Sequence, residues 1–203
     1  SYSSHFSKKK IFLLSIPIFF SNLATPLVGI VDTGLMGNLG QTKFLAATSI
    51  ATSVMTMIIW SFGFLRMGTV GLVAQSFGRG EFREIVRTIL RNLLLAVFIS
   101  LIIIILKPLI VSLISNFFPT STETQNLINT YISIRIFSVP AELIIYILIG
   151  FYLGIQKTNI SSLLVITLSV LNVLFSSFFV LSLGLEVPGV ALGTLIASLI
   201  TVT

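Results

Sequence analysis

The sequence of 203 residues contains no cysteine and a single histidine, His5, and only 9% of its residues are charged. Without cysteine the chain can form neither a disulfide nor a cysteine-ligated metal site. Because the one histidine lies in a polar stretch near the start, a zinc site, a haem site or a Ser-His-Asp triad is not expected. We therefore expect no metal, no cofactor and no enzymatic activity, and a membrane-embedded enzyme is the least favoured reading.

Apolar residues are abundant instead. The chain is 55% hydrophobic, and its mean hydropathy is +1.10. A soluble domain carries about 25% charged residues, so this composition indicates an integral membrane protein. The net charge of +6 does not indicate a nucleic-acid partner, because the basic residues lie between apolar runs, as they do in the loops of membrane proteins.

Six apolar segments are each long enough for a membrane helix of about 20 residues. They predict an all-α membrane protein, a bundle of six transmembrane helices formed by residues 11–203, with the sixth helix truncated and an N-terminal tail, 1–10. Prolines inside the segments predict kinks, and they are Pro17, Pro26, Pro108 and Pro140. The segments are 11–37, 44–77, 85–115, 124–155, 158–183 and 188–203.

The distribution of basic residues predicts how the helices are oriented. If the N-terminus is cytoplasmic, the outer side holds only Lys43 and Lys107. The excess on the inner side fits the positive-inside rule, so we expect a multi-pass protein of the cytoplasmic membrane with a cytoplasmic N-terminus. The inner residues are Lys8, Lys9, Lys10, Arg79, Arg83, Arg87, Arg91 and Lys157.

Four ionisable residues fall within the segments: Asp32, Arg66, Arg135 and Glu142. Each costs roughly 2.5–3.5 kcal/mol at a helix centre, so such residues face a bundle interior or a wet cavity and often mark an ion or substrate path. Arg66 and Glu142 lie at matching depths, roughly 18–21 Å from the inner helix ends, and we predict that they pair. Arg135 is the expected basic neighbour of Asp32. The alternative is that these charges only fix helix packing.

Asp32 is the only aspartate in the chain, and Pro26 precedes it by six residues. A low dielectric disfavours a charged carboxylate, whereas a nearby arginine favours it. A carboxylate balanced in this way, on a helix that can bend, suits a coupled transporter.

Gly150 and Gly154 form a small-xxx-small pattern that predicts close helix packing.

Four phrases of the sequence resemble the multidrug and toxic compound extrusion (MATE) family: VDTGLMGNLG, GFLRMGTVGLVAQSFGRG, IRIFSVPAELIIYILIGFYLGIQ and NVLFSSFFVLSLGLEVPGVALGT. GFLRMGTVGL is similar to the DinF-like branch. The resemblance covers nearly the whole chain in order. It implies a twelve-helix, two-lobe transporter with this chain as the N-terminal lobe, and the C-terminal lobe of the same protein as its partner. It also implies an antiporter that exports small organic compounds as protons or sodium ions enter.

The resemblance also assigns residues. Asp32 matches the first-helix aspartate that couples to a cation or proton, and Pro17 matches the proline about which that helix bends. Asn172 and Thr194 match polar residues of the same cavity. Where several members have an acid four residues after the asparagine, this chain has Ser176. With one carboxylate instead of two, we expect proton rather than sodium coupling.

Two further functions stay open at this point. A lipid-linked oligosaccharide flippase of the same superfamily would need a strongly cationic cavity for a diphosphate, whereas Arg66 and Arg135 are balanced by Asp32 and Glu142. A non-catalytic structural membrane subunit would have to carry four buried charges without using them. Under every one of these functions, membrane lipid is an expected partner of this protein.

Overall fold

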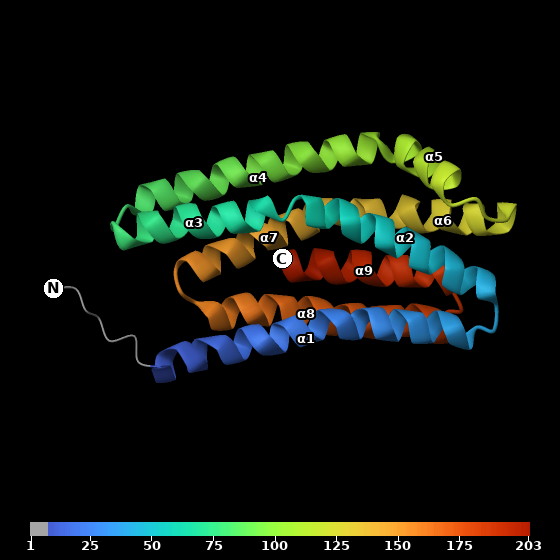
Figure 1. Cartoon of the computed structure of the whole chain (residues 1–203), viewed down its shortest axis with the longest axis horizontal. Helices are drawn as coiled ribbons and strands as arrows, with labels where there is room; N and C mark the ends of the chain where they lie inside the picture. Colours follow the sequence, from blue (N-terminus) through green and yellow to red (C-terminus); the bar gives the residue numbers. More distant parts are fainter. Residues whose placement is uncertain (1–7) are drawn as a thin grey trace.

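The computed structural model describes residues 8–203, which form a bundle of helices aligned along one long axis (Figure 1). Within this range there is no β-strand. The predicted tail, 1–10, and its histidine therefore lie almost wholly outside the described residues. The helices are α1 (Lys8–Asn38), α2 (Thr42–Ser61), α3 (Phe64–Gly78), α4 (Phe82–Ile105), α5 (Lys107–Phe117), α6 (Thr122–Arg135), the 3₁₀ turn η1 (Ile136–Ser138), α7 (Val139–Gly154), α8 (Thr158–Ser177), the π turn η2 (Phe178–Ser182) and α9 (Glu186–Val202).

These elements reproduce the predicted spans. By length and composition, five stretches of the described chain are able to cross a membrane, and the sixth apolar helix, Glu186–Val202, is shorter. The second span consists of α2 and α3, and the fourth consists of α6, η1 and α7. The all-α class is therefore confirmed.

The spans are interrupted where proline removes a backbone N–H, and also at two unpredicted places. Pro108 is the second residue of α5 and Pro140 is the second residue of α7, so the kinks predicted there are confirmed. By contrast α1 is unbroken through Pro17 and Pro26. The break between α2 and α3 at Phe62 and Gly63, and the π turn after α8, were not predicted from the sequence.

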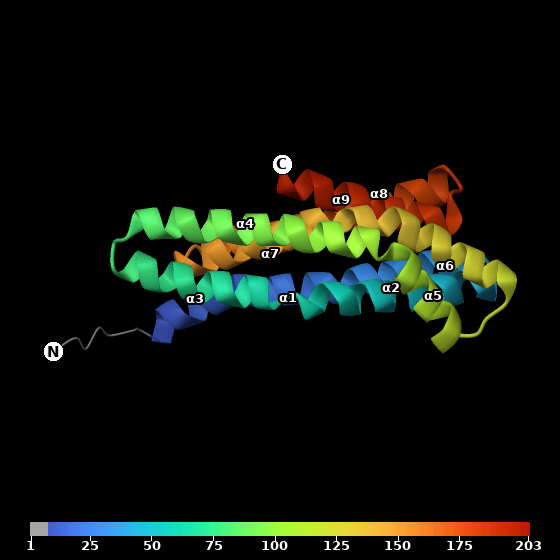
Figure 2. The same cartoon turned by 90° about the horizontal axis from the view of Figure 1, so that it is seen from above.

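The ends of the helices gather the loops into two groups. The α3–α4 and α7–α8 turns lie at one end of the long axis, and the α1–α2 and α5–α6 connections lie at the other (Figures 1 and 2). The first end, called the basic end here, carries Arg79, Arg83 and Lys157. At the opposite end Lys43 Nζ lies 2.9 Å from Glu123 Oε2.

Packing inside the bundle depends on small residues at helix contacts. A Cβ atom built on Gly150 would come within 2.7 Å of the Arg66 carbonyl oxygen, and one on Gly154 within 2.7 Å of Val73 Cγ1. The close packing predicted for the two glycines is therefore confirmed, and the partner is α3. Helix α4, by contrast, carries a row of large exposed apolar side chains, which suits contact with lipid. They are Phe82, Val86, Leu90, Leu94, Phe98, Leu101 and Ile105.

Candidate functional site

Asp32 lies in the last third of α1, where the helix turns one side toward the bundle. Most of α1 is exposed in this chain, but Asp32, Leu35 and Met36 are buried, at 7%, 8% and 0% exposure. Their spacing of three and four residues places them on one helix face. The carboxylate oxygen Oδ1 of Asp32 is buried and has no hydrogen-bond partner among the described residues. A buried acceptor without a donor is costly, so this oxygen is suited to receive a proton or a cation.

Three polar side chains of α8 and α9 lie beside this carboxylate as one hydrogen-bonded chain. Ser176 Oγ donates to Asn172 Oδ1 at 3.2 Å, and Asn172 Nδ2 donates to Thr194 Oγ1 at 2.9 Å. Thr194 Oγ1 donates to the carbonyl oxygen of Val190 at 3.2 Å. The Ser176 hydroxyl also interacts with the Asp32 carboxylate. The structure therefore brings together Asp32, Asn172, Ser176 and Thr194, as the sequence suggested.

The α9 backbone determines which atom donates and which accepts in these hydrogen bonds. Thr194 gives its only hydroxyl proton to a carbonyl, so its oxygen can only accept from Asn172. The Asn172 amide must then turn its NH₂ toward Thr194 and its oxygen toward Ser176. Consequently the Ser176 hydroxyl is the one member with a choice of acceptor, Asn172 or Asp32.

An ion pair lies next to this cluster, at the break between α6 and α7. Arg135 Nη1 donates to Glu142 Oε1 and to Ser138 Oγ. The side chains of Arg135 and Glu142 are only 10% and 13% exposed. Ser138 Oγ also lies 2.9 Å from Glu142 Oε1. Arg135 also lies close enough to Asp32 to act on it electrostatically, so one guanidinium lies near two carboxylates.

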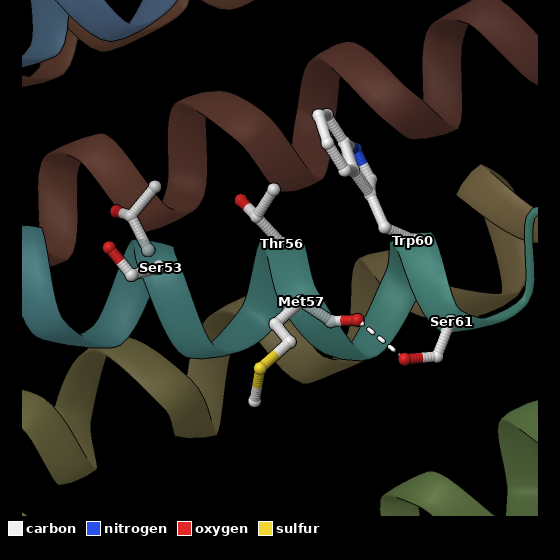
Figure 3. A pocket seen from close by; sticks show the side chains of 6 residues that line it. Ser53, Thr56, Met57, Trp60 and Ser61 are labelled. Atoms are coloured by element: carbon white, nitrogen blue, oxygen red, sulfur yellow. Dashed lines mark hydrogen bonds between the residues drawn. The ribbon is translucent and has the colours of Figure 1, made fainter.

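A hollow of about 630 Å³ opens along α2. Figure 3 shows Ser53, Thr56 and Trp60 directed to one side of the helix, with Met57 on another. Trp60 is 70% exposed and Met57 is 65% exposed. At one margin of the hollow Thr52 Oγ1 donates to the Tyr131 hydroxyl at 3.0 Å. Tyr131 lies four residues before Arg135 on α6, so this bond joins the margin of the hollow to the helix that carries the ion pair.

Comparison with known proteins identifies the family. Residues 17–178 match the MatE family model. The chain belongs to the MatE family. It is 31% identical over 195 residues to DNA damage-inducible protein F of Escherichia coli (strain K12), which covers 96% of this chain and 42% of that protein. The resemblance to the MATE family and its DinF-like branch is therefore confirmed.

Other MatE relatives agree with this assignment. Multidrug export protein MepA of Staphylococcus saprophyticus is 20% identical over 97% of this chain and 44% of its own length. A crystal structure of MATE in complex with MaD3S superposes with a TM-score of 0.88 at 25% identity, over 96% of this chain and 44% of that one. The chain thus spans less than half the length of these MatE relatives.

One predicted contact of the MatE chain is wrong. Arg66 does not pair with Glu142, and it forms no ion pair with any acid within residues 8–203. Glu142 instead pairs with Arg135, seven residues earlier in the same span. Positions seven apart lie on the same helix face, about 10 Å apart along the axis, and the long arginine side chain spans that distance. Comparing the depths of residues in different spans does not reveal a partner within the same span.

Sequence reasoning also missed Tyr131, Ser138 and Ser198. Tyr131 is 1% exposed, and Ser198 Oγ lies 3.5 Å from Glu142 Oε1. A buried tyrosine needs a partner for its hydroxyl, so a tyrosine four residues before Arg135 in an apolar span was an available signal. For the serines there was none, because serine in a helix usually bonds its own backbone.

Proposed function

We propose that this chain is the N-terminal lobe of a secondary antiporter, which exports small organic compounds across the cytoplasmic membrane while protons enter through Asp32. The observation that carries the proposal is the buried Asp32 oxygen, which has no hydrogen-bond donor among the described residues and lies beside a connected set of polar side chains. A second lobe would complete the transporter, and the basic end would be cytoplasmic. No covalent chemistry is required of any residue, so the protein acts as a carrier and not as an enzyme.

Proton binding at Asp32 would reverse one hydrogen bond. When the carboxylate is charged, Ser176 can turn its single proton toward Asp32 and release Asn172. When the carboxyl group is protonated, it donates to Ser176, which then donates to Asn172 as observed at 3.2 Å. Asn172 and Thr194 keep the same orientation in both states, because Val190 fixes them. The carboxyl proton thus controls contacts between α1 and α8.

Protons suit this site better than sodium ions. The position four residues after Asn172 is Ser176, so Asp32 is the only carboxylate in the hydrogen-bonded set. A sodium ion would have one charged ligand and neutral oxygens around it. A proton needs only the one carboxylate oxygen and an acceptor, and Ser176 supplies that acceptor.

The hollow on α2 is the favoured place for the organic compound. Cavities of roughly 300–1,000 Å³ accommodate drug-sized ligands, and this one has about 630 Å³. Trp60 and Met57 offer an aromatic and a polarisable surface, while Ser53 and Thr56 offer hydroxyls. The relative multidrug export protein MepA supports the transport class through its similarity to this chain.

The test is Asp32→Asn in the full-length protein, reconstituted in vesicles with an imposed proton gradient. Asparagine keeps the size of the side chain but cannot titrate, so gradient-driven export of an organic cation should stop. The matched control is Glu123→Gln, which makes the same change from carboxylate to amide at an exposed helix end and should leave export unchanged. Undiminished proton-driven export by Asp32→Asn would falsify the role of Asp32. Export driven by sodium alone in the wild type would contradict proton coupling.

A further inference from the structure

A second polar cavity lies closer to the basic end, between α1, α3, α7 and α8. Its volume is about 100 Å³, and Asn22, Arg66, Ser161 and Ser162 line it together with apolar side chains. A water molecule takes up about 30 Å³ of liquid volume, so the space suits a single small polar group. It is too small for the drug-sized compounds assigned to the hollow on α2.

Every polar side chain that lines this cavity can donate a hydrogen bond, and none is acidic. Ser161 and Ser162 are 5% and 4% exposed, yet their hydroxyls have no hydrogen-bond partner in the described part of the chain. The Asn22 amide has none there either. Because these buried hydroxyls line an open space, they are available to a ligand that accepts hydrogen bonds.

Within residues 8–203, the arginine in this cavity has no counter-ion. Arg66 lies mid-span, and the nearby acid of the same bundle, Glu142, is already paired with Arg135. The carbonyl oxygen of Arg66 lies close against Gly150 of α7, so α3 and α7 pack closely beside the cavity. An unpaired charge at this depth is costly. A bound anion would offset that cost.

The start of α8 adds to the positive character of the cavity. Ser161 and Ser162 lie just past the first turn of this 20-residue helix, which has no acidic residue in that turn. Helix N-termini carry a partial positive charge and free N–H groups. Lys157 directly precedes the helix. All of these groups therefore favour a negatively charged ligand: the N-terminus of α8, Lys157, Arg66 and the two serine hydroxyls.

We propose that this cavity is an oxyanion site, which binds a phosphate group supplied either by a lipid headgroup or by a free anion. Arg66 forms the ion pair, and Asn22, Ser161 and Ser162 donate hydrogen bonds to the remaining oxygens. The lobe then has two polar sites of opposite preference: a proton or cation site at Asp32 and an anion site near the basic end. The anion site does not depend on what drives transport or on what is exported.

Binding is measured on the full-length protein in neutral detergent, as the shift of its thermal unfolding midpoint. The probes are inorganic phosphate and dihexanoylphosphatidylglycerol, each against chloride at equal ionic strength. A ligand that binds only the folded state raises the midpoint. Losing charge-assisted hydrogen bonds should raise the apparent Kd by about ten- to a hundredfold in Arg66→Gln. Arg91→Gln is the matched control, because Arg91 is exposed and unpaired within the described chain.

Phosphate stabilises many folded proteins by exclusion from their surfaces, so only the difference between variants counts. A shift with phosphate that Arg66→Gln loses supports a site for free anions. A shift with the lipid alone, again lost in Arg66→Gln, supports a headgroup site. If Arg66→Gln does not fold, the double variant Ser161→Ala/Ser162→Ala keeps the charge and should still weaken binding. Equal shifts in the wild type and in the variants, or no shift with either probe, would overturn the proposal.

Discussion

Gly193 of α9 lies directly against the backbone of Ser176 in α8. A Cβ atom built on Gly193 would come within 2.6 Å of the Ser176 nitrogen and 2.7 Å of its Cα. No side chain larger than hydrogen fits between the two helices at this level. The absence of a side chain on α9 is therefore what brings Thr194 within hydrogen-bonding distance of Asn172.

The variant Gly193→Ala should separate α8 from α9 at the site. Overpacking a tight contact typically costs about 1–3 kcal/mol, so the unfolding midpoint of the full-length protein in detergent should fall, and export should fall with it. Gly68→Ala in α3 is the control, since a Cβ there meets no atom within 4 Å. Equal stability of the two variants would show that the contact can relax.

The Arg135–Glu142 ion pair should be energetically coupled. Removing one partner of a buried pair costs about 3–5 kcal/mol in soluble proteins, so Glu142→Gln should lower stability strongly. Adding Arg135→Gln should then cost much less than it does alone. The Lys43–Glu123 pair, whose side chains are 36% and 72% exposed, is the comparison and should contribute about 0–1 kcal/mol. Strictly additive losses at 135 and 142 would contradict the coupling.

Trp60 should set the affinity for aromatic cations. An exposed cation–π contact contributes about 0.5–1 kcal/mol, which corresponds to about a two- to fivefold change in affinity. Trp60→Ala should therefore raise the half-saturating concentration of a rhodamine-type substrate by about that factor, and Trp60→Phe should restore part of the loss. The readout is uptake into inverted vesicles at several substrate concentrations. An unchanged half-saturating concentration in Trp60→Ala would place the compound elsewhere.

The orientation of the bundle can be tested with single cysteines in a cysteine-free full-length background. Thr120→Cys lies at the end opposite the basic end, and Glu81→Cys lies at the basic end. Both positions are exposed. In intact cells an impermeant thiol reagent should label Thr120→Cys alone, and permeabilisation should add Glu81→Cys. The reverse order of labelling would invert the proposed topology.

The sequence predicts the spans and much of the site because both depend on local chemistry. The length of an apolar segment predicts a membrane helix. A single aspartate or asparagine in such a helix needs other polar groups beside it, and Asp32 and Asn172 both have them. Prolines at 108 and 140 predict the breaks there. The roles of Asn172 and Thr194 came from the family resemblance, and the structure adds which atom donates to which.

Other features depend on packing that the sequence does not display. The partner of Glu142 could not be chosen from depth alone, because Arg66 and Arg135 are both basic and both fall within spans. The oxyanion cavity requires knowing that α1, α3, α7 and α8 meet at one place. Likewise the sequence presents Ser161 and Ser162 as ordinary helix serines, and only the structure shows that their hydroxyls have no partner among the described residues.

The place of Pro26 in α1 has a mechanical consequence. Proline has no N–H to donate to the carbonyl of Asn22, four residues earlier, so α1 resists bending less at this turn, as it also does at Pro17. Asp32 lies beyond it and Asn22 lies before it. A bend of about 20° at Pro26 would move the far end of the 18-residue arm, at Lys8, by about 9 Å, and Asn22 by only about 2 Å. Pro26 thus lies between the two polar sites on α1. A bend there that moves Asn22 only slightly at the anion cavity moves the Lys8 end of the helix several times further.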